Sequence, residues 1–440
     1  MKKPLLLALW FLPALARGGD LATDKLDNWP HWRGPLANGT APKGDPPLNW
    51  DDKTNIKWKA ALPGRGSATP IVWGDRVFVA TAIDTGRQAK PEALPKADPK
   101  FKTKTSPPTT FHQWVVLCFD RATGKERWRQ VAAEAVPHEG HHLTHSYAAY
   151  SPTTDGKHLY VSFGSRGVHC YDFEGNRIWK RDLGLMHTRL AWGEGASPAL
   201  YGDTLVVNFD QEAGSFLACL DAKNGETRWK IERDEVTTWA TPLIVEHKGR
   251  VQVVVPATNQ VRSYDLKDGR LIWTGGPLTT NCIPSPVAAN GVVYVMSGYQ
   301  GAKAYAIALD ATGDVGDKLL WQYERGTPYV PSPVLAGDRL YFTQSNDPLL
   351  TCLDIKTGKP IIDRARLPGL TSLYASPVCA AGRIYVTGRD GTTLVLKQAD
   401  QLDILATNTL DDPIDASPVV VGKQLFLRGE KYLYCIEAAR

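Results

Sequence analysis

The stretch LDAKNGETRW, residues 220–229, contains the pattern that decides the fold. An apolar run ends at Asp221, Gly225 supplies a turn, and a second run closes at Trp229. The stretches FDRATGKERW (residues 119–128) and YDLKDGRLIW (residues 264–273) repeat the same acid, turn glycine and terminal tryptophan. Two short runs joined by a glycine turn predict an antiparallel pair of β-strands.

A longer repeat surrounds this pattern. A Ser-Pro or Thr-Pro pair is followed each time by two more apolar runs around a turn, as in SPALYGDTLVVNF (residues 197–209). Four strands in a repeat of about 44 residues are typical of a β-propeller blade. The prolines of these pairs are Pro70, Pro152, Pro198, Pro242, Pro286, Pro333, Pro377 and Pro418.

The fourth strands predict how the ring closes. Tryptophan ends this strand in repeats one to five, and Ile362 and Leu405 hold roughly that place in repeats six and seven. Repeat eight lacks a fourth strand, whereas NIKWK (residues 55–59) carries Trp58 without a blade of its own. A ring leaves no unpaired sheet edge if this segment completes the last blade. We therefore expect an all-β, eight-bladed β-propeller of four-stranded antiparallel blades, closed by the N-terminal strand.

The domain organisation follows from this pattern. Residues 55–440 are expected to form a single propeller, and residues 81–113 a Pro-rich and Lys-rich loop inserted in the first blade. Residues 17–54 are expected to be an extended segment.

The acid, turn glycine and terminal tryptophan of these repeats resemble the tryptophan-docking repeat of pyrroloquinoline-quinone (PQQ) propellers. The resemblance covers about residues 55–440, and that superfamily includes quinoprotein alcohol dehydrogenases and the BamB-like lipoproteins of outer-membrane assembly. The leader NWPHWRGPLANGTAP (residues 28–42) also resembles that of secreted PQQ-like repeat proteins of planctomycete-type bacteria. The resemblance implies a fold rather than a function, because function belongs to sites placed on folds.

Composition and the N-terminus predict an exported globular protein. The chain is 43% hydrophobic and 22% charged, which is ordinary for a folded protein. Residues 1–16, MKKPLLLALWFLPALA, combine two lysines, a short apolar run and an A-x-A site, so we expect a signal peptide and a periplasmic or secreted protein. No cysteine follows that site to take a lipid, and no later run has the length of a membrane span. A net charge of +5 gives no reason to expect nucleic acid as a partner.

An H-E-x-x-H pattern occurs at His138, Glu139 and His142. In zinc proteases this pattern holds a metal on one face of a helix. Gly140 in its middle is a poor helix former, and the residues that follow lead into a strand. We expect a polar loop rather than a peptidase site, with a non-protease metal or ligand contact as the alternative.

The seven cysteines are expected to be free and buried. Five of them stand two residues before the acid that ends the third strand, where Ser263 and Ala308 stand in other repeats. A repeated position filled by Cys, Ser or Ala indicates a small buried side chain. The same position in neighbouring sheets lies about 10 Å apart, beyond the reach of a disulfide. The five cysteines are Cys118, Cys170, Cys219, Cys352 and Cys435.

One face of the propeller carries the most variable loops. If the strands of a blade are named a to d from the inside outward, the b-to-c and d-to-a links emerge on one face. The a-to-b and c-to-d turns on the other face are short and nearly uniform in this sequence. Functional residues are often placed on variable loops over a rigid scaffold, so the first face is the candidate site.

Charged and aromatic residues are expected to surround the central channel on this face, as a polar ligand site requires. Those just before each Ser/Thr-Pro are Arg65, His145, Glu194, Trp239, Asn281, Tyr329, Tyr374 and Asp415, and the loops add Arg166, Asp210, Asn259, Arg389 and Arg428. We expect ligand binding from Arg65, His145, Arg166, Glu194, Asp210, Trp239, Asn259, Arg389, Asp415 and Arg428, and predict neither catalytic residues nor metal ligands.

The sequence favours an exported, monomeric, non-catalytic binding or scaffold propeller. It would hold a protein, a glycan or another small polar ligand at the channel mouth, without a cofactor. The alternative implied by the resemblance is a quinoprotein oxidoreductase that uses PQQ and calcium on an alcohol or sugar. In that case Trp239 would stack under the quinone, and Arg166, Arg389 and Arg428 would pair its carboxylates. Against it, the chain has no two adjacent cysteines for the vicinal disulfide of those enzymes and is considerably shorter.

Overall fold

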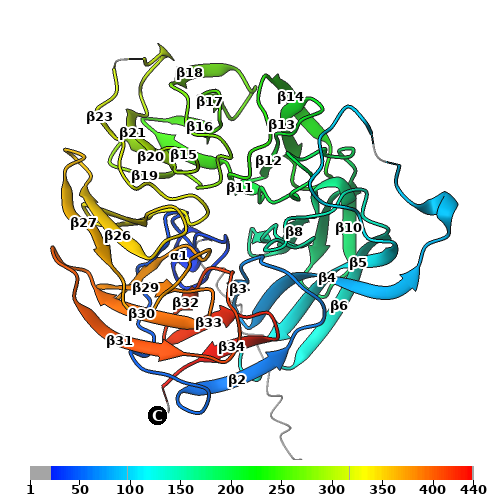
Figure 1. Ribbon diagram of the computed structural model, residues 1–440, viewed down its shortest axis with the longest axis horizontal. Coiled ribbons are helices and arrows are strands. Elements are labelled where there is room, and N and C mark those ends of the chain that lie inside the picture. The colour runs from blue at the N-terminus through cyan, green and yellow to red at the C-terminus, as the bar shows by residue number, and fades with distance from the viewer. Residues whose placement is uncertain (1–20, 97, 317, 439–440) are drawn as a thin grey trace, which may run out of the picture.

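Eight antiparallel blades of four strands form a closed ring, which confirms the expected β-propeller (Figure 1). The structure is a computed structural model that describes residues 21–96, 98–316 and 318–438. The b and c strands are buried over most of their length, because neighbouring blades cover both of their faces, and the outer half of β4 in blade 1 is the exception. The d strands lie at the rim and alternate between buried and exposed residues, as strands with one wet face do.

The strands of blades 1 to 4, from a to d, are β3 (Ile71–Trp73), β4 (Arg76–Gln88), β5 (Thr110–Asp120) and β6 (Glu126–Ala135); β7 (Thr153–Thr154), β8 (His158–Ser162), β9 (Val168–Asp172) and β10 (Arg177–Arg181); β11 (Ala199–Tyr201), β12 (Thr204–Phe209), β13 (Ser215–Asp221) and β14 (Thr227–Arg233); β15 (Leu243–His247), β16 (Arg250–Val255), β17 (Val261–Asp265) and β18 (Leu271–Gly275).

Those of blades 5 to 8 are β19 (Val287–Ala289), β20 (Val292–Ser297), β21 (Lys303–Ala308) and β23 (Trp321–Tyr323); β24 (Val334–Ala336), β25 (Arg339–Thr343), β26 (Leu349–Asp354) and β27 (Pro360–Arg366); β28 (Val378–Ala380), β29 (Arg383–Thr387), β30 (Thr392–Lys397) and β31 (Ile404–Thr409); β32 (Val419–Val421), β33 (Gln424–Arg428), β34 (Tyr432–Ile436) and β2 (Ile56–Ala61). The remaining elements are α1 (Leu21–Leu26), β1 (Thr40–Ala41), β22 (Gly313–Asp314) and the 3-10 turns η1 (Pro91–Ala93) and η2 (Gly164–Arg166).

The repeated acid, glycine and tryptophan join one blade to the next. Trp128 Nε1 donates a 2.8 Å hydrogen bond to the carbonyl of Phe173 in the c-to-d turn of blade 2. A Cβ on Gly175 in that turn would lie 2.8 Å from the indole, so only glycine leaves room for the ring. Asp172 shapes the turn by accepting the backbone N–H of Asn176 at 2.8 Å. Trp58, Trp179, Trp229 and Trp321 make the same indole-to-carbonyl contact.

The ring closes at the strand that the sequence left without a blade. β2 pairs antiparallel with β34, from Ile56 opposite Ile436 to Ala61 opposite Tyr432. It therefore supplies strand d of blade 8, and the predicted closure is confirmed.

Two details of register differ from the expectations. Ala306, not Ala308, faces Trp321, because the longer chain between β21 and β23 also forms β22, which pairs with β18 of the neighbouring blade. Ala406, not Leu405, holds the tryptophan place in blade 7, because Leu405 is the extra residue of a β-bulge and is 39% exposed.

The segment before the first blade crosses the opening of the ring, with α1 inside it (Figure 1). Asn28 and Asp45 make 2.7 Å hydrogen bonds with Gly74 and Gly422, in the a-to-b turns of blades 1 and 8. β1 pairs in parallel with β28, the innermost strand of blade 7. Arg33, 1% exposed, donates to two backbone carbonyls at the start of the innermost strands of blades 6 and 7 at 2.6 and 3.1 Å. The segment therefore covers the channel from the face opposite the candidate site.

The insertion in blade 1 extends β4 and β5 beyond the ring and then reaches the link between blades 2 and 3 (Figure 1). Lys104 N donates to Leu190 O at 2.9 Å, and Thr105 Oγ1 donates to Ala191 O at 2.5 Å. Leu190 and Ala191 have φ values of 56° and 54°, a conformation that is unfavourable for residues with a Cβ. The insertion thus supports a strained loop on the candidate face.

All seven cysteines are buried and none forms a disulfide, as expected. Cys219 pairs across the strands with Trp229 and Cys435 with Trp58, so a small side chain faces each docking tryptophan.

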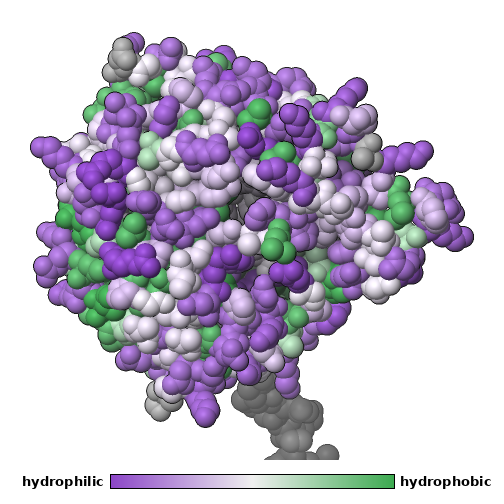
Figure 2. Space-filling model, in the orientation of Figure 1, coloured by the Kyte–Doolittle hydropathy of each residue, from purple (hydrophilic) through white to green (hydrophobic). Residues whose placement is uncertain are grey.

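In the part of the chain that the structure describes, no helix is long and apolar enough to cross a membrane. The expected signal peptide, residues 1–16, lies outside the described residues. Hydrophilic residues dominate the face seen in Figure 2, with the apolar ones in small separate groups.

Candidate functional site

A pocket of about 380 Å³ occupies the central channel. The residue three positions before the Ser/Thr-Pro proline lines it in every blade. Because these residues lead into the innermost strands from the d-to-a links, the pocket lies on the side of the variable loops. Trp32 of the N-terminal segment also lines it and forms its floor. The eight wall residues are Ser67, Ala149, Gly195, Trp239, Ile283, Val330, Tyr374 and Asp415.

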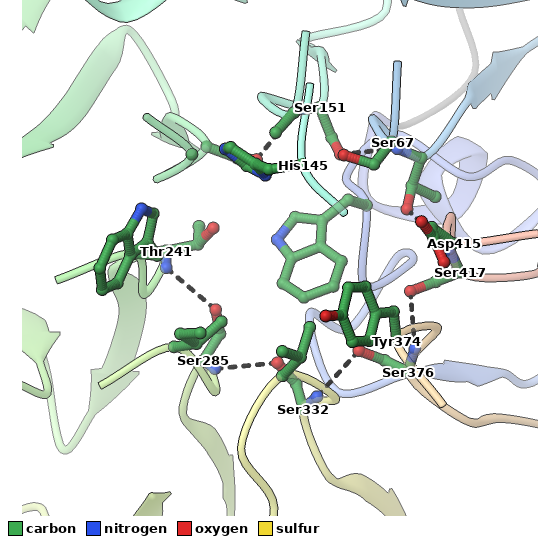
Figure 3. Close-up of a pocket in the computed structure, with 18 of the residues that line it drawn as sticks. Ser67, His145, Ser151, Thr241, Ser285, Ser332, Tyr374, Ser376, Asp415 and Ser417 are labelled. Carbon is green, nitrogen blue, oxygen red and sulfur yellow. Dashed lines mark hydrogen bonds between the residues drawn. The ribbon is translucent and has the colours of Figure 1, made fainter. Parts of the chain in front are cut away.

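A ring of hydroxyl groups surrounds the pocket (Figure 3). It consists of the serine or threonine before each repeat proline: Thr69, Ser151, Ser197, Thr241, Ser285, Ser332, Ser376 and Ser417, all at most 6% exposed. Seven of these hydroxyls accept the backbone N–H of the equivalent residue in the preceding blade, at 2.9 to 3.2 Å. Among the described residues, only the link from Ser197 to Thr241 is not made. We call this set the hydroxyl ring.

Aromatic side chains form much of the pocket wall: Trp32, Trp192, Trp239, Tyr299, Tyr329 and Tyr374. The rings of Tyr299 and Tyr329 are stacked, with centroids 4.6 Å apart. Trp239 Nε1 donates to Gly193 O at 2.7 Å, which fixes the indole while its ring lines the cavity. The wall therefore offers flat apolar faces to a ligand.

Asp415 is the one carboxylate that lines the pocket, and no lysine or arginine lines it within residues 21–96, 98–316 and 318–438. Arg389 binds both Asp415 oxygens, at 2.6 and 3.1 Å, and its guanidinium lies 4.0 Å from the Tyr374 ring centroid. Burial raises the pKa of Asp415, and the Arg389 guanidinium opposes that shift. Tyr374 also shares a 2.8 Å hydrogen bond with Thr144. The pocket is therefore close to neutral.

His145 stands beside Trp239 in the wall. A Cβ on Gly195 would lie 3.6 Å from His145 Cε1 and 3.3 Å from Trp239 Cδ1, so this glycine lies between the two rings. His145 Nε2 donates to Glu194 O at 2.9 Å. Burial lowers the pKa of His145 to about 4, against the opposing effect of that hydrogen bond. The imidazole is neutral at pH 7.

The HEGHH segment forms an irregular loop and no helix. His138 Nε2 donates to a backbone carbonyl at 2.6 Å, and the His142 ring bonds the Thr144 hydroxyl at 2.8 Å. The Glu139 carboxylate accepts the N–H and hydroxyl of Thr188 at 3.0 and 2.9 Å. Among the described residues, no three His, Cys, Asp or Glu side chains are placed to hold a metal together. The three motif side chains instead hold the loop itself.

Three of the ten expected ligand-binding residues, His145, Trp239 and Asp415, line the central pocket, and Arg389 lies behind Asp415. Arg65 and Arg428 line a small cavity beside it. Arg65 pairs with Glu430 at 3.2 Å. Arg428 is 2% exposed and donates to a backbone carbonyl at 2.7 Å, and burial lowers its pKa to about 9.

The other four lie away from the pocket. Arg166 and Glu194 line a second small cavity, where Glu194 accepts a 2.5 Å hydrogen bond from the Ser165 hydroxyl and Arg166 covers the Trp114 ring at 4.9 Å. Asp210 is fully buried and pairs with an arginine of blade 3 at 2.8 Å. Asn259 donates from its backbone and side-chain nitrogens to Glu235 and Asp234, in the link between blades 3 and 4. These residues stabilise loops rather than line the central pocket.

Sequence reasoning missed the pocket residues Trp32, Thr144, Trp192 and Tyr299, and also the hydroxyl ring, and it gave the loop of His142 only as an alternative ligand contact. The sequence does contain a signal for the hydroxyl ring, because its residues are the serines and threonines of the Ser/Thr-Pro pairs that define the repeat. Trp192 stands three residues before Gly195 in the d-to-a link, so extending the rim by a few residues would have included it. Trp32 had none, because the repeats say nothing about where the N-terminal segment runs.

Comparison with known proteins places the chain among PQQ-like propellers. The pattern of the family described as outer membrane protein assembly factor BamB matches residues 112–363 and 213–440. A tetrathionate hydrolase from Acidithiobacillus ferrooxidans is 24% identical over 265 residues, which are 54% of this chain and 48% of that protein. The chain thus spans about half the length of this curated relative.

Solved propellers are similar in structure. BamB from Moraxella catarrhalis is 14% identical with a TM-score of 0.55, over 81% of this chain and 98% of that one. A quinohemoprotein alcohol dehydrogenase from Comamonas testosteroni is 10% identical with a TM-score of 0.64, over 94% of this chain and 82% of that one. At these identities the likeness shows the fold alone.

Proposed function

Because the chain belongs to the family described as outer membrane protein assembly factor BamB, we propose that it is an exported, non-catalytic binding propeller whose ligand occupies the central pocket. The observation that carries this proposal is an aromatic-walled pocket of about 380 Å³, where residues from all eight blades meet over a floor made by Trp32. Its volume lies within the range of about 300–1,000 Å³ that ligand pockets span.

The acid and base groups of the pocket are already engaged in holding it together. Asp415 pairs with Arg389, the His145 ring N–H is given to a backbone carbonyl, and His142 bonds Thr144. General acid–base or nucleophilic catalysis needs such a group to face the reacting atoms. The geometry therefore supports binding better than turnover.

The same residues do not fit PQQ with calcium. PQQ carries carboxylates, but Asp415 is the charged side chain on the described wall, and Arg166, Arg389 and Arg428 are bound to other partners. Calcium takes several oxygen ligands and favours more than one carboxylate, yet the described wall offers one, Asp415, whose charge Arg389 already neutralises. Tetrathionate, the anion in the name of the hydrolase relative, would likewise meet no lysine or arginine on the described wall.

The proposal is tested by fluorescence and thermal-shift titration of the exported protein with PQQ plus calcium, with tetrathionate, and with a library of small neutral compounds. We expect no saturable signal from the two anions and no dye-linked oxidation of alcohols or sugars. We expect at least one neutral compound to raise the melting temperature, and the effect to be lost in Trp239→Ala.

Trp73→Ala is the matched control. Trp73 is the last residue of β3, and its ring lies against Gly156, outside the pocket. It should keep the ligand response. A saturable PQQ signal that depends on Trp239, or PQQ-dependent turnover, would overturn the proposal.

A further inference from the structure

The hydroxyl ring has hydrogen-bonding capacity that the protein does not use. A serine or threonine hydroxyl can donate one hydrogen bond and accept two. Seven of the eight hydroxyls accept one backbone N–H, and in the described structure none of the eight donates to a protein acceptor. All eight are more than nine-tenths buried and line the pocket. Buried polar groups normally find partners, so a ligand that reaches the ring should supply acceptors and donors.

The floor adds another unused donor. Trp32 lines the pocket, and its buried Nε1 has no hydrogen-bond partner among the described residues. An indole N–H can only donate, so its partner must be an acceptor such as a hydroxyl oxygen.

The walls require a second property of the ligand. Trp192 and Trp239 stand on one side of the pocket in blades 3 and 4, and Tyr299, Tyr329 and Tyr374 follow in blades 5 to 7. These rings offer apolar faces to a flat apolar surface of the ligand. A ligand that carries hydroxyls around its edge and C–H groups on its faces satisfies both the ring and the walls.

Charge narrows the class further. The Asp415 carboxylate is neutralised by two hydrogen bonds from Arg389. The buried His145 ring is neutral because burial lowers its pKa, although the ring also donates to a backbone carbonyl. Neither an anion nor a cation would find an uncompensated opposite charge on the described wall.

Resting on the proposed function, the geometry points to a neutral saccharide of one or two rings as the ligand, with a C–H face on Trp239 and its hydroxyls on the hydroxyl ring and Asp415. Asp415 keeps acceptor capacity beyond its two bonds to Arg389, since a carboxylate has about four lone-pair sites. It can therefore accept a sugar hydroxyl without losing its ion pair.

The test is calorimetric titration of the exported protein with glucose, galactose, N-acetylglucosamine, maltose and cellobiose. Glucuronate and choline serve as anionic and cationic probes. We expect at least one neutral sugar to bind, with roughly tenfold loss of affinity in Trp239→Ala and also in Asp415→Asn. Trp73→Ala should bind as the unmodified protein does, and melting curves should show that each variant is folded.

A loss of affinity in Asp415→Asn has a second explanation, because this substitution also removes the charged partner of Arg389. Ser332→Ala, which removes one hydroxyl of the ring without touching a charge, should weaken sugar binding by a few-fold and leave the Arg389 pair in place. If choline or glucuronate binds through Trp239 while the sugars do not, the saccharide inference falls and the binding function stands. If no sugar binds and PQQ supports turnover, both fall.

Discussion

Trp58 donates a 3.0 Å hydrogen bond from its indole nitrogen to the carbonyl of Arg121, and this bond joins blade 8 to blade 1. A Cβ on Gly124 would lie 2.6 Å from the same indole. β2, which is strand d of blade 8, thus contacts blade 1 through Trp58. This is the same tryptophan contact that joins the other blades to their neighbours.

Removing this strand should open the ring. A protein that begins at residue 60 would expose the edge of β34 and the apolar face under Trp58, whereas one that begins at residue 55 keeps β2. We expect the shorter protein to melt well below the longer one and to aggregate, as measured by calorimetry and light scattering. Equal melting temperatures would contradict the closure model.

Acid should weaken the fold through its buried histidines. The pKa of His145 is lowered by burial from 6.5 to about 4, so below pH 6.5 the unfolded chain binds a proton that the folded chain refuses. The contribution of His145 to the free energy of unfolding is therefore fully present above pH 6.5 and is lost as the pH falls toward 4. His145 alone accounts for about 2 kcal/mol at pH 5. Urea unfolding of His145→Gln should show a shallower fall between pH 6.5 and 5, and His247→Gln, at the end of β15, is the control.

The HEGHH loop should not need a metal. Its histidine and carboxylate partners are protein groups, so mild chelation should leave the melting temperature unchanged and metal analysis should give well below one zinc per chain. Glu139→Gln should instead lower stability by about 1–3 kcal/mol, since it disturbs the buried hydrogen bonds to Thr188. Stoichiometric zinc that disappears when His138 and His142 are replaced would show a metal site.

The insertion in blade 1 should hold the loop that carries Trp192. Thr105→Val removes the bond to Ala191 O while keeping the shape of the side chain. We expect faster hydrogen exchange at residues 190–193 and little change in melting temperature, because the strained φ values lose their support. Thr109→Val, in the same insertion and bonded to Gln88, should leave that exchange unchanged. Equal protection in both variants would refute this role.

The thiols should be inert until the protein unfolds. Burial raises the pKa of Cys118, Cys170, Cys219, Cys352 and Cys435 to about 12, so little thiolate exists at neutral pH. Thiol titration should find few reactive groups in the native protein and seven in denaturant without reductant. A count below six would reveal a disulfide.

The fold was predictable because the docking contact is local and repeated. The acid, glycine and tryptophan lie within ten residues, so each copy specifies its own turn and the contact with its neighbour. The pocket wall was accessible for the same reason, since Trp239, Tyr374 and Asp415 each stand three residues before a repeat proline. The predicted register was wrong where the repeat is irregular, at the long link of blade 5 and at the bulge that contains Leu405.

The expected arginines show what a linear pattern cannot decide. Loop position placed Arg389 and Arg428 near the channel, but partners distant in sequence decide where their guanidinium groups point. Arg389 turns to Asp415, and Arg428 turns to the carbonyl of Ala68, 360 residues away. Trp32 could not be predicted as a pocket residue, because it belongs to a segment outside the repeats that runs into the central channel.

The hydroxyl ring also has a consequence for how a ligand is oriented. Because every blade contributes the same group, a bound molecule rotated by one blade about the channel axis would meet an almost equivalent set of partners. The ring by itself is therefore rotationally degenerate and cannot select one pose. That selection falls to the layer above it, where Trp239, Tyr374 and Asp415 interrupt a set of smaller side chains and break the eightfold equivalence.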